Sequence, residues 1–226
     1  DGVVDFPVPP GTGAVTTTLM TSDDNSEQLD FSVFPGFDFY GETYGSVFVS
    51  TNGFVTFGEG SSAFDNYVDE LFALPGVSAL RSDLNPLEGG AVVVDELADR
   101  VVVTWQGVPR YGMSSPNDVQ MILGSDGTIE LHYVTVALAD ALIGLSAGRG
   151  LGPYPPETDL VPPAVEDCAA GADNDFDGAT AWEAAGAGEA AGEEQALNTS
   201  MATSMSAAIR LKALFIRTPP TYLFSS

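Results

Sequence analysis

Three aspartates alternate in the C-terminal part of the chain, within the stretch DNDFDG. Asp173, Asp175 and Asp177 are followed directly by Gly178. In calcium loops of the EF-hand type, carboxylates at positions one, three and five bind one Ca²⁺, and a glycine at position six permits a sharp turn. Carboxylates packed this closely repel one another unless a cation neutralises them. The spacing therefore predicts a Ca²⁺ site in this loop.

The remainder of the loop departs from an EF-hand. Ala179 offers its backbone carbonyl at position seven, but Ala184 stands at position twelve, where a bidentate glutamate is expected. Glu183 lies one residue earlier and is the expected remaining ligand. An acidic, solvated linker without a metal is the alternative interpretation.

The segments that precede this loop have the pattern of short β-strands. SVFVSTNGFVTFG places Val47 and Val49 on one face of a strand and Phe48 on the other, and Asn52-Gly53 predicts a type I′ hairpin turn. Two further hairpins and a last strand are expected at 91–105, 119–134 and 141–145. Strands at this spacing predict an all-β fold, an antiparallel β-sandwich that is jelly-roll-like.

Details of this body can be predicted as well. A polar turn is expected at 95–99, a second turn at Asp126-Gly127, and one or two helical turns within 65–74. Core or sheet-face positions are expected for Phe54, Phe57, Trp105 and Tyr133.

The order of these motifs resembles a known family. It is similar to the order in nidogen-like (NIDO-type) modules. The motifs are FPGFDFYGETYGSVFVSTNGFVTFG, then LRSDLNP with a strand ending in Trp105, then the SDGTIELHYV hairpin and ALIGLSAG. The resemblance covers about residues 30–150 and implies a β-rich extracellular module of bacterial surface or secreted proteins, without catalytic residues to carry over. One departure is Arg81-Ser82, where an aromatic residue is expected. The aspartate loop resembles thrombospondin type 3 repeats, in which Cys168 would be paired.

The sequence contains one pattern that is typical of a catalytic serine. GLSAG matches the G-x-S-x-G nucleophile pattern around Ser146, but a proline-rich stretch follows where a helix is required. The only histidine, His132, precedes Ser146 and lies in a predicted strand. One histidine and one cysteine are too few for a typical catalytic zinc site. We therefore expect no enzymatic activity.

The charge of the chain limits its partners. The formal net charge is −25, from 32 acidic and 7 basic residues, which disfavours nucleic acid and anionic membranes. No apolar run is long enough to span a membrane. Cys168 is the single cysteine, so it is either a free thiol or forms an intermolecular disulfide. An N-terminus at Asp1 suits signal-peptide removal or a trimmed chain, and the composition suits a secreted or cell-surface protein.

The predicted organisation has four parts. A nidogen-like sandwich (1–150) is followed by a proline-rich linker (151–165), the Asp-rich loop (166–185) and an Ala/Gly/Ser-rich tail (186–226). The tail ends in an apolar segment with three basic and no acidic residues after position 194.

The end of the tail alternates with the period of a strand. Ile209, Leu211, Ala213 and Phe215 form its apolar face. Such a strand could pair with the sheet edge of a second acidic copy, fold onto its own sandwich or remain disordered. The first alternative predicts a homo-oligomer or polymer.

These observations together predict a function in binding and assembly. We expect a calcium-stabilised structural or adhesion module that self-assembles as a filament or matrix subunit. The alternative is a carbohydrate- or ligand-binding accessory module of a larger secreted protein or hydrolase, with surface glycans or matrix proteins as partners. Tyr111 and Tyr154 are the candidate ligand-face residues for that alternative.

Overall fold

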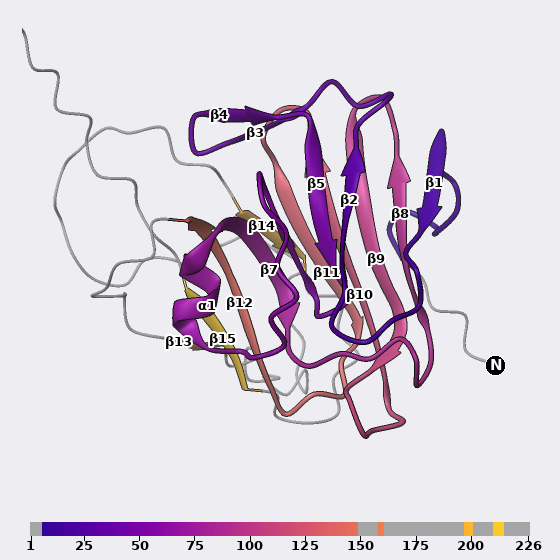
Figure 1. The fold of residues 1–226 in the computed structure, drawn as a ribbon, viewed down its shortest axis with the longest axis vertical. Coiled ribbons are helices and arrows are strands. Elements are labelled where there is room, and N and C mark those ends of the chain that lie inside the picture. Colours follow the sequence, from indigo (N-terminus) through magenta and orange to yellow (C-terminus); the bar gives the residue numbers. More distant parts are fainter. Residues whose placement is uncertain (1–5, 149–157, 161–196, 201–209, 215–226) are drawn as a thin grey trace, which may run out of the picture.

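The computed structural model describes residues 6–148, 158–160, 197–200 and 210–214. Its strands form two large sheets packed face to face, with a small hairpin of β3 (Phe37–Phe39) and β4 (Glu42–Tyr44) beside them (Figure 1). Every strand pair within residues 6–148 is antiparallel. The predicted all-β, antiparallel sandwich is therefore confirmed.

The first sheet has six strands. Their order is β1 (Val15–Thr18), β8 (Ala91–Glu96), β9 (Arg100–Pro109), β10 (Pro116–Gly124), β11 (Ile129–Thr135) and β14 (Leu197–Ser200).

The second sheet has seven strands. Their order is β13 (Thr158–Leu160), β15 (Arg210–Leu214), β12 (Asp140–Ala147), β7 (Pro75–Arg81), β6 (Phe54–Thr56), β5 (Ser46–Ser50) and β2 (Ser26–Asp30).

The core fills the space between the sheets, and alternation along each strand determines its members. Val47 and Val49 of β5 are fully buried, as the period-two pattern predicts. Two polar tips cross the core to the opposite sheet: Trp105 Nε1 donates to the Ser50 carbonyl at 2.9 Å, and the Tyr133 hydroxyl donates to the Ala79 carbonyl at 2.8 Å. These bonds satisfy the buried polar atoms and fix the two sheets relative to each other.

Helix α1 (Val68–Ala73) lies against the outer face of the second sheet (Figure 1). Its Leu71 and Phe72 pack with Leu142 of β12, whereas the neighbouring Ala141 and Ile143 belong to the main core. Strand β12 is therefore covered on both faces, and the short helix predicted within 65–74 is confirmed.

Arg81 occupies the position where the family resemblance leads one to expect an aromatic residue. Its side chain is 2% exposed and its guanidinium lies 4.0 Å from the Phe54 ring centroid. Nε donates to the Asp65 carbonyl at 2.9 Å, and Nη2 lies 3.6 Å from Glu70 Oε2. Burial lowers the pKa of Arg81 to about 10, although the nearby charges of Glu70, Asp65 and Asp69 act in the opposite direction. Arg81 thus joins β7 to the loop and helix that cover it.

Two expected turns differ in the structure. Gly53 has a φ of +79° but Asn52 does not adopt a positive φ, so the type I′ turn is wrong, and a three-residue connection joins β5 to β6. The polar turn at 95–99 is also partly wrong, because Asp95 and Glu96 extend β8 and are buried. In both places buried polar side chains bond to neighbouring backbone, which local turn propensity does not anticipate. The turn at Asp126-Gly127 is confirmed, with a Gly127 φ of +85°.

The described tail segments complete both sheets on the same side. β14 pairs in parallel with β11, and β15 pairs in parallel with β12 and antiparallel with β13. Within the described residues, no helix is long and apolar enough to cross a membrane.

Candidate functional site

One end of the sandwich is organised around Asn52. The side chain is fully buried where β5 ends, and its amide nitrogen donates to Asp24 Oδ1 at 3.0 Å and to the Ala63 carbonyl at 3.2 Å. Its oxygen accepts from the Leu84 backbone nitrogen at 2.8 Å. One amide therefore joins three loops, which lie before β2, before α1 and after β7. We call this region, with the adjoining β9–β10 loop, the loop end.

Three carboxylates gather at the loop end. Oxygen atoms of Asp23, Asp24 and Asp83 all lie within 4.8 Å of one another, and each side chain is half-buried. Asp23 and Asp24 precede β2, whereas Asp83 follows β7. Asp24 takes a φ of +36°, and Asp23 Oδ1 is shielded from solvent without a hydrogen-bond donor. Clustered carboxylate oxygens are the ligands that hard divalent cations such as Ca²⁺ prefer.

The electrostatics of this cluster disfavour three free charges. Desolvation and then the neighbouring Asp24 carboxylate raise the pKa of Asp23. Desolvation, followed by repulsion from Asp24 and Asp23, also raises the pKa of Asp83, although Arg110 acts in the opposite direction. A bound cation would offset this repulsion, because an opposite charge favours the ionised carboxylates.

The loop after β7 and the β9–β10 loop are bonded together beside the carboxylates. The Tyr111 nitrogen donates to the Asp83 carbonyl at 2.8 Å, and the Gly112 nitrogen donates to Glu88 Oε2 at 2.8 Å. Tyr111 is 56% exposed, so its ring is available to a ligand. Such exposure suits the ligand-face role predicted for Tyr111, and binding by this residue stays a prediction.

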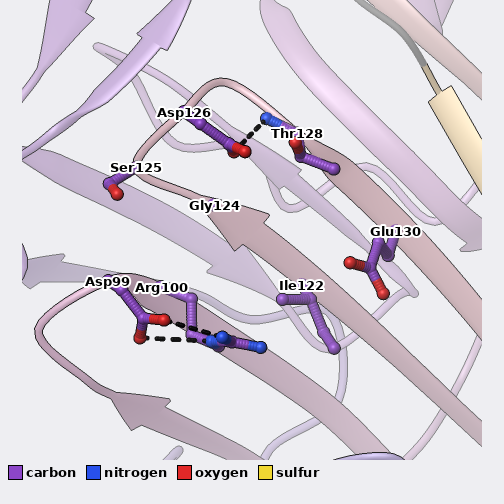
Figure 2. Close-up of a pocket in the computed structure, with 8 residues that line it drawn as sticks. All are labelled: Asp99, Arg100, Ile122, Gly124, Ser125, Asp126, Thr128 and Glu130. Atoms are coloured by element: carbon purple, nitrogen blue, oxygen red, sulfur yellow. Dashed lines mark hydrogen bonds and ion pairs between the residues drawn. The ribbon is translucent and has the colours of Figure 1, made fainter.

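The opposite end of the first sheet carries a shallow depression of about 190 Å³. Figure 2 shows two local interactions among its lining residues: Arg100 contacts Asp99 at 2.6 Å, and Asp126 Oδ1 accepts from the Thr128 nitrogen at 3.0 Å. The depression lies between two hairpin turns and is lined mainly by polar and charged residues. The lining residues come from the two turns and from the ends of the strands beside them, and among them there is no set of acid, base and nucleophile.

Two buried carboxylates next to each other in β8 hold neighbouring loops. Asp95 accepts from the backbone nitrogens of Gly11 and Gly13, both at 2.8 Å. Glu96 accepts from three consecutive backbone nitrogens, at residues 32–34, and from the Ser32 hydroxyl at 2.9 Å. Desolvation opposes ionisation of Glu96, but these hydrogen bonds outweigh it and lower its pKa. Both carboxylates are structural anchors.

Most of the predicted site residues lie outside the described residues. This holds for the whole calcium loop (Asp173, Asp175, Asp177, Ala179 and Glu183) and for Cys168, Tyr154, Ile209 and Phe215. Leu211 and Ala213 lie in β15, where their backbones pair with Ala141 and Ile143 of the same chain. The described tail segment therefore pairs with its own sandwich.

In the described structure, Ser146 of the G-x-S-x-G pattern and the histidine His132 lie in different sheets. Ser146 is fully buried in β12, and its Oγ accepts from the Gly148 nitrogen at 3.0 Å. His132 lies in β11 of the other sheet, with Nε2 3.0 Å from Glu130 Oε2. A strand, and not a sharp strand-to-helix turn, contains Ser146.

The Asp23–Asp24–Asp83 cluster was not predicted as a site. Asp23 and Asp24 are adjacent in the sequence, but such pairs arise by chance among 32 acidic residues. Asp83 is distant in the sequence. It comes near only because β2 starts, and β7 ends, at the same end of one sheet. The one local signal was the polar run around Asn25, which marks a loop without marking a ligand set.

Comparisons with known proteins agree with the fold. The sequence matches the NIDO-related family over residues 7–160, a longer range than the resemblance noted from motifs alone. No curated protein and no solved structure matches the chain. The family match covers more than half of the 226 residues, and it includes the loop end with its three aspartates. The chain belongs to the NIDO-related family.

Proposed function

We propose that this protein is a secreted or cell-surface structural module that self-assembles through its C-terminal strand and is stabilised by Ca²⁺. Membership of the NIDO-related family supports an extracellular β-rich module. The proposal assigns no catalytic activity to the chain.

The single observation that carries the assembly proposal is the pairing of the tail. Strands β14 and β15 add to β11 and β12, which would otherwise be the edge strands on that side of the two sheets. Without these partners, β11 and β12 would present unpaired backbone groups, which readily pair with another chain. The same edges that accept the tail within one chain can accept the tail of a second copy.

Charge favours the same arrangement. The tail after position 194 carries Arg210, Lys212 and Arg217 and no acidic residue, whereas the chain as a whole has a net charge of −25. A basic strand is attracted to the next acidic sandwich, and this attraction offsets part of the repulsion between two copies.

Two groups of carboxylate oxygens support the proposed stabilisation by Ca²⁺. The alternating aspartates at 173, 175 and 177 have the spacing of a calcium loop. The Asp23–Asp24–Asp83 cluster provides a second set of close carboxylates within the described residues.

Particle size tests the proposal. Light scattering and negative-stain microscopy would compare the full chain with a chain ending at Gly192, each in calcium and in chelator. We expect ordered particles from the full chain in calcium only, and monomers from the shortened chain. A full chain that stays monomeric in both solutions would contradict self-assembly.

A second candidate function is a ligand-binding accessory module, favoured by the exposed ring of Tyr111. Binding on a glycan array by a monomeric full chain, reduced by Tyr111→Ala, would support this alternative. Ester or peptide hydrolysis that is lost in Ser146→Ala would contradict both proposals.

A further inference from the structure

Large apolar side chains are exposed on the two bonded loops of the loop end. Leu87 is 62% exposed, Tyr111 56% and Met113 58%. Leu87 lies in the loop after β7, and the other two lie in the β9–β10 loop. Hydrogen bonds from Tyr111 to Asp83 and from Gly112 to Glu88 bring these loops together, and a large exposed apolar patch commonly marks an interaction site.

The exposed side chains extend onto the other two loops that Asn52 joins. Met20, beside the Asp23–Asp24 loop, is 72% exposed, and Phe64 before α1 is 45% exposed. Phe64 follows Ala63, whose carbonyl accepts from Asn52. Methionine and aromatic side chains are enriched at protein–protein interfaces, where they adapt to a partner and bury much area.

Backbone hydrogen bonds hold these loops in place. The Asn85 nitrogen donates to the Pro109 carbonyl at 2.9 Å, and the Tyr111 nitrogen donates to the Asp83 carbonyl at 2.8 Å. The Leu84–Arg110 bridge continues this pairing. A surface that is ordered before binding loses less entropy when a partner arrives.

Acidic groups accompany the apolar side chains. Asp23, Asp24 and Asp83 lie within 4.8 Å of one another, and Glu88 bonds to the nitrogen of Gly112 in the β9–β10 loop. Glu88 is also close enough to raise the pKa of Asp23. An apolar surface with this concentration of negative charge favours a positively charged partner and repels an acidic one.

We propose that the loop end docks a cationic peptide segment with large apolar side chains, supplied by another protein. The apolar side chains of the segment would pack on Leu87, Tyr111 and Met113, and its basic groups would face Asp83 and Glu88. Leucine and methionine suit apolar peptide side chains better than the hydroxyl-bearing faces of a glycan. This inference goes beyond the proposed function, because it requires neither the tail nor Ca²⁺.

Fluorescence anisotropy with a labelled peptide, RLRFRLR amide, tests the proposal on the full chain in chelator. The double variant Leu87→Ser/Tyr111→Ser should bind at least about tenfold more weakly, the loss expected when interface anchors are removed. Asp83→Asn should weaken binding by a smaller factor, and added salt should weaken wild-type binding.

Matched controls lie at the opposite end of the molecule. Val15→Ser removes an apolar side chain that is 40% exposed in β1, and Asp126→Asn removes a carboxylate in the β10–β11 turn. Both should bind the peptide like the wild type, and thermal unfolding should show that every variant is folded.

Several results would overturn the proposal. One is that the wild type does not bind RLRFRLR, and another is that the loop-end variants and the control variants bind it equally well. Equal affinity of the wild type for the acidic peptide ELEFELE would overturn the proposal too. Competition by cellohexaose or chitohexaose would assign the loop end to a glycan instead. Particle formation by the full chain is measured separately, so failure here leaves the proposed self-assembly intact.

Discussion

Asp83 faces two other carboxylates across loops that belong to different parts of the sequence. Because desolvation and the neighbouring aspartates raise its pKa in the folded state, its ionised form costs stability at neutral pH. That cost is relieved as the pH falls through the folded pKa, or when a cation binds.

Replacing Asp83 with asparagine should therefore have opposite effects in two solutions. In chelator, Asp83→Asn should unfold at a higher temperature than the wild type, because repulsion from Asp23 and Asp24 decreases. Replacing chelator with calcium should raise the unfolding temperature less for the variant than for the wild type. Differential scanning fluorimetry measures both, and Asp126→Asn is the matched carboxylate control. An equal calcium-dependent rise in all three proteins would exclude the cluster as a cation site.

At the scale of elements, buried carboxylates connect strands to loops that have no regular structure. Glu96, at the end of β8, receives hydrogen bonds from three backbone nitrogens at 32–34. Glu96→Gln should lower the free energy of unfolding at neutral pH by about 1–3 kcal/mol, the usual cost of leaving buried donors poorly paired.

The pH dependence of this loss has a definite sign. The folded pKa of Glu96 is lowered, so its contribution is complete above the unfolded pKa of about 4.3 and disappears as pH falls through the folded pKa. Urea unfolding of both proteins from neutral to acidic pH should show the difference shrinking below that value. A difference that stays constant with pH would contradict the role of the ionised form.

Alternation and turn residues predicted many of the strands, because alternate residues along a strand face the core between the sheets. Val47 and Val49 on β5 and the Asp126-Gly127 turn follow the predicted pattern. Asp95 and Glu96 do not follow the predicted pattern. Aspartate and glutamate normally indicate exposed positions, and the backbone groups that bond to these two side chains come from loops distant in the sequence. The candidate site escaped prediction for the same reason: Asp83 joins Asp23 and Asp24 only through strand order.

At the scale of the whole molecule, negative charge dominates. With a net charge of −25, repulsion acts against every compact state of the chain. Raising NaCl from about 10 mM to about 500 mM shortens the screening length from about 30 Å to a few ångströms. The unfolding temperature should rise with salt in chelator. An unfolding temperature that falls over this range would mean that specific ion pairs outweigh the general repulsion.

The buried Asn52 has a chemical consequence for the lifetime of the protein. Asn-Gly sequences deamidate when the glycine nitrogen attacks the side-chain carbonyl carbon and the side-chain nitrogen leaves as ammonia. The resulting succinimide is opened by water to aspartate or isoaspartate. In the folded chain this attack is hindered, because both polar atoms of the Asn52 amide are bonded and the Gly53 carbonyl accepts from Ala79 and Leu80.

Unfolding removes that protection. The resulting carboxylate could not donate to Asp24 or Ala63 and would add a negative charge beside the Asp23–Asp24–Asp83 cluster, so the altered chain should refold poorly. Refolding yield should decrease with time spent in denaturant at alkaline pH and remain high at mildly acidic pH, with peptide mass spectrometry locating the change at residue 52. The covalent change would accumulate with the total time that molecules spend unfolded, and the fraction that no longer refolds would report that time.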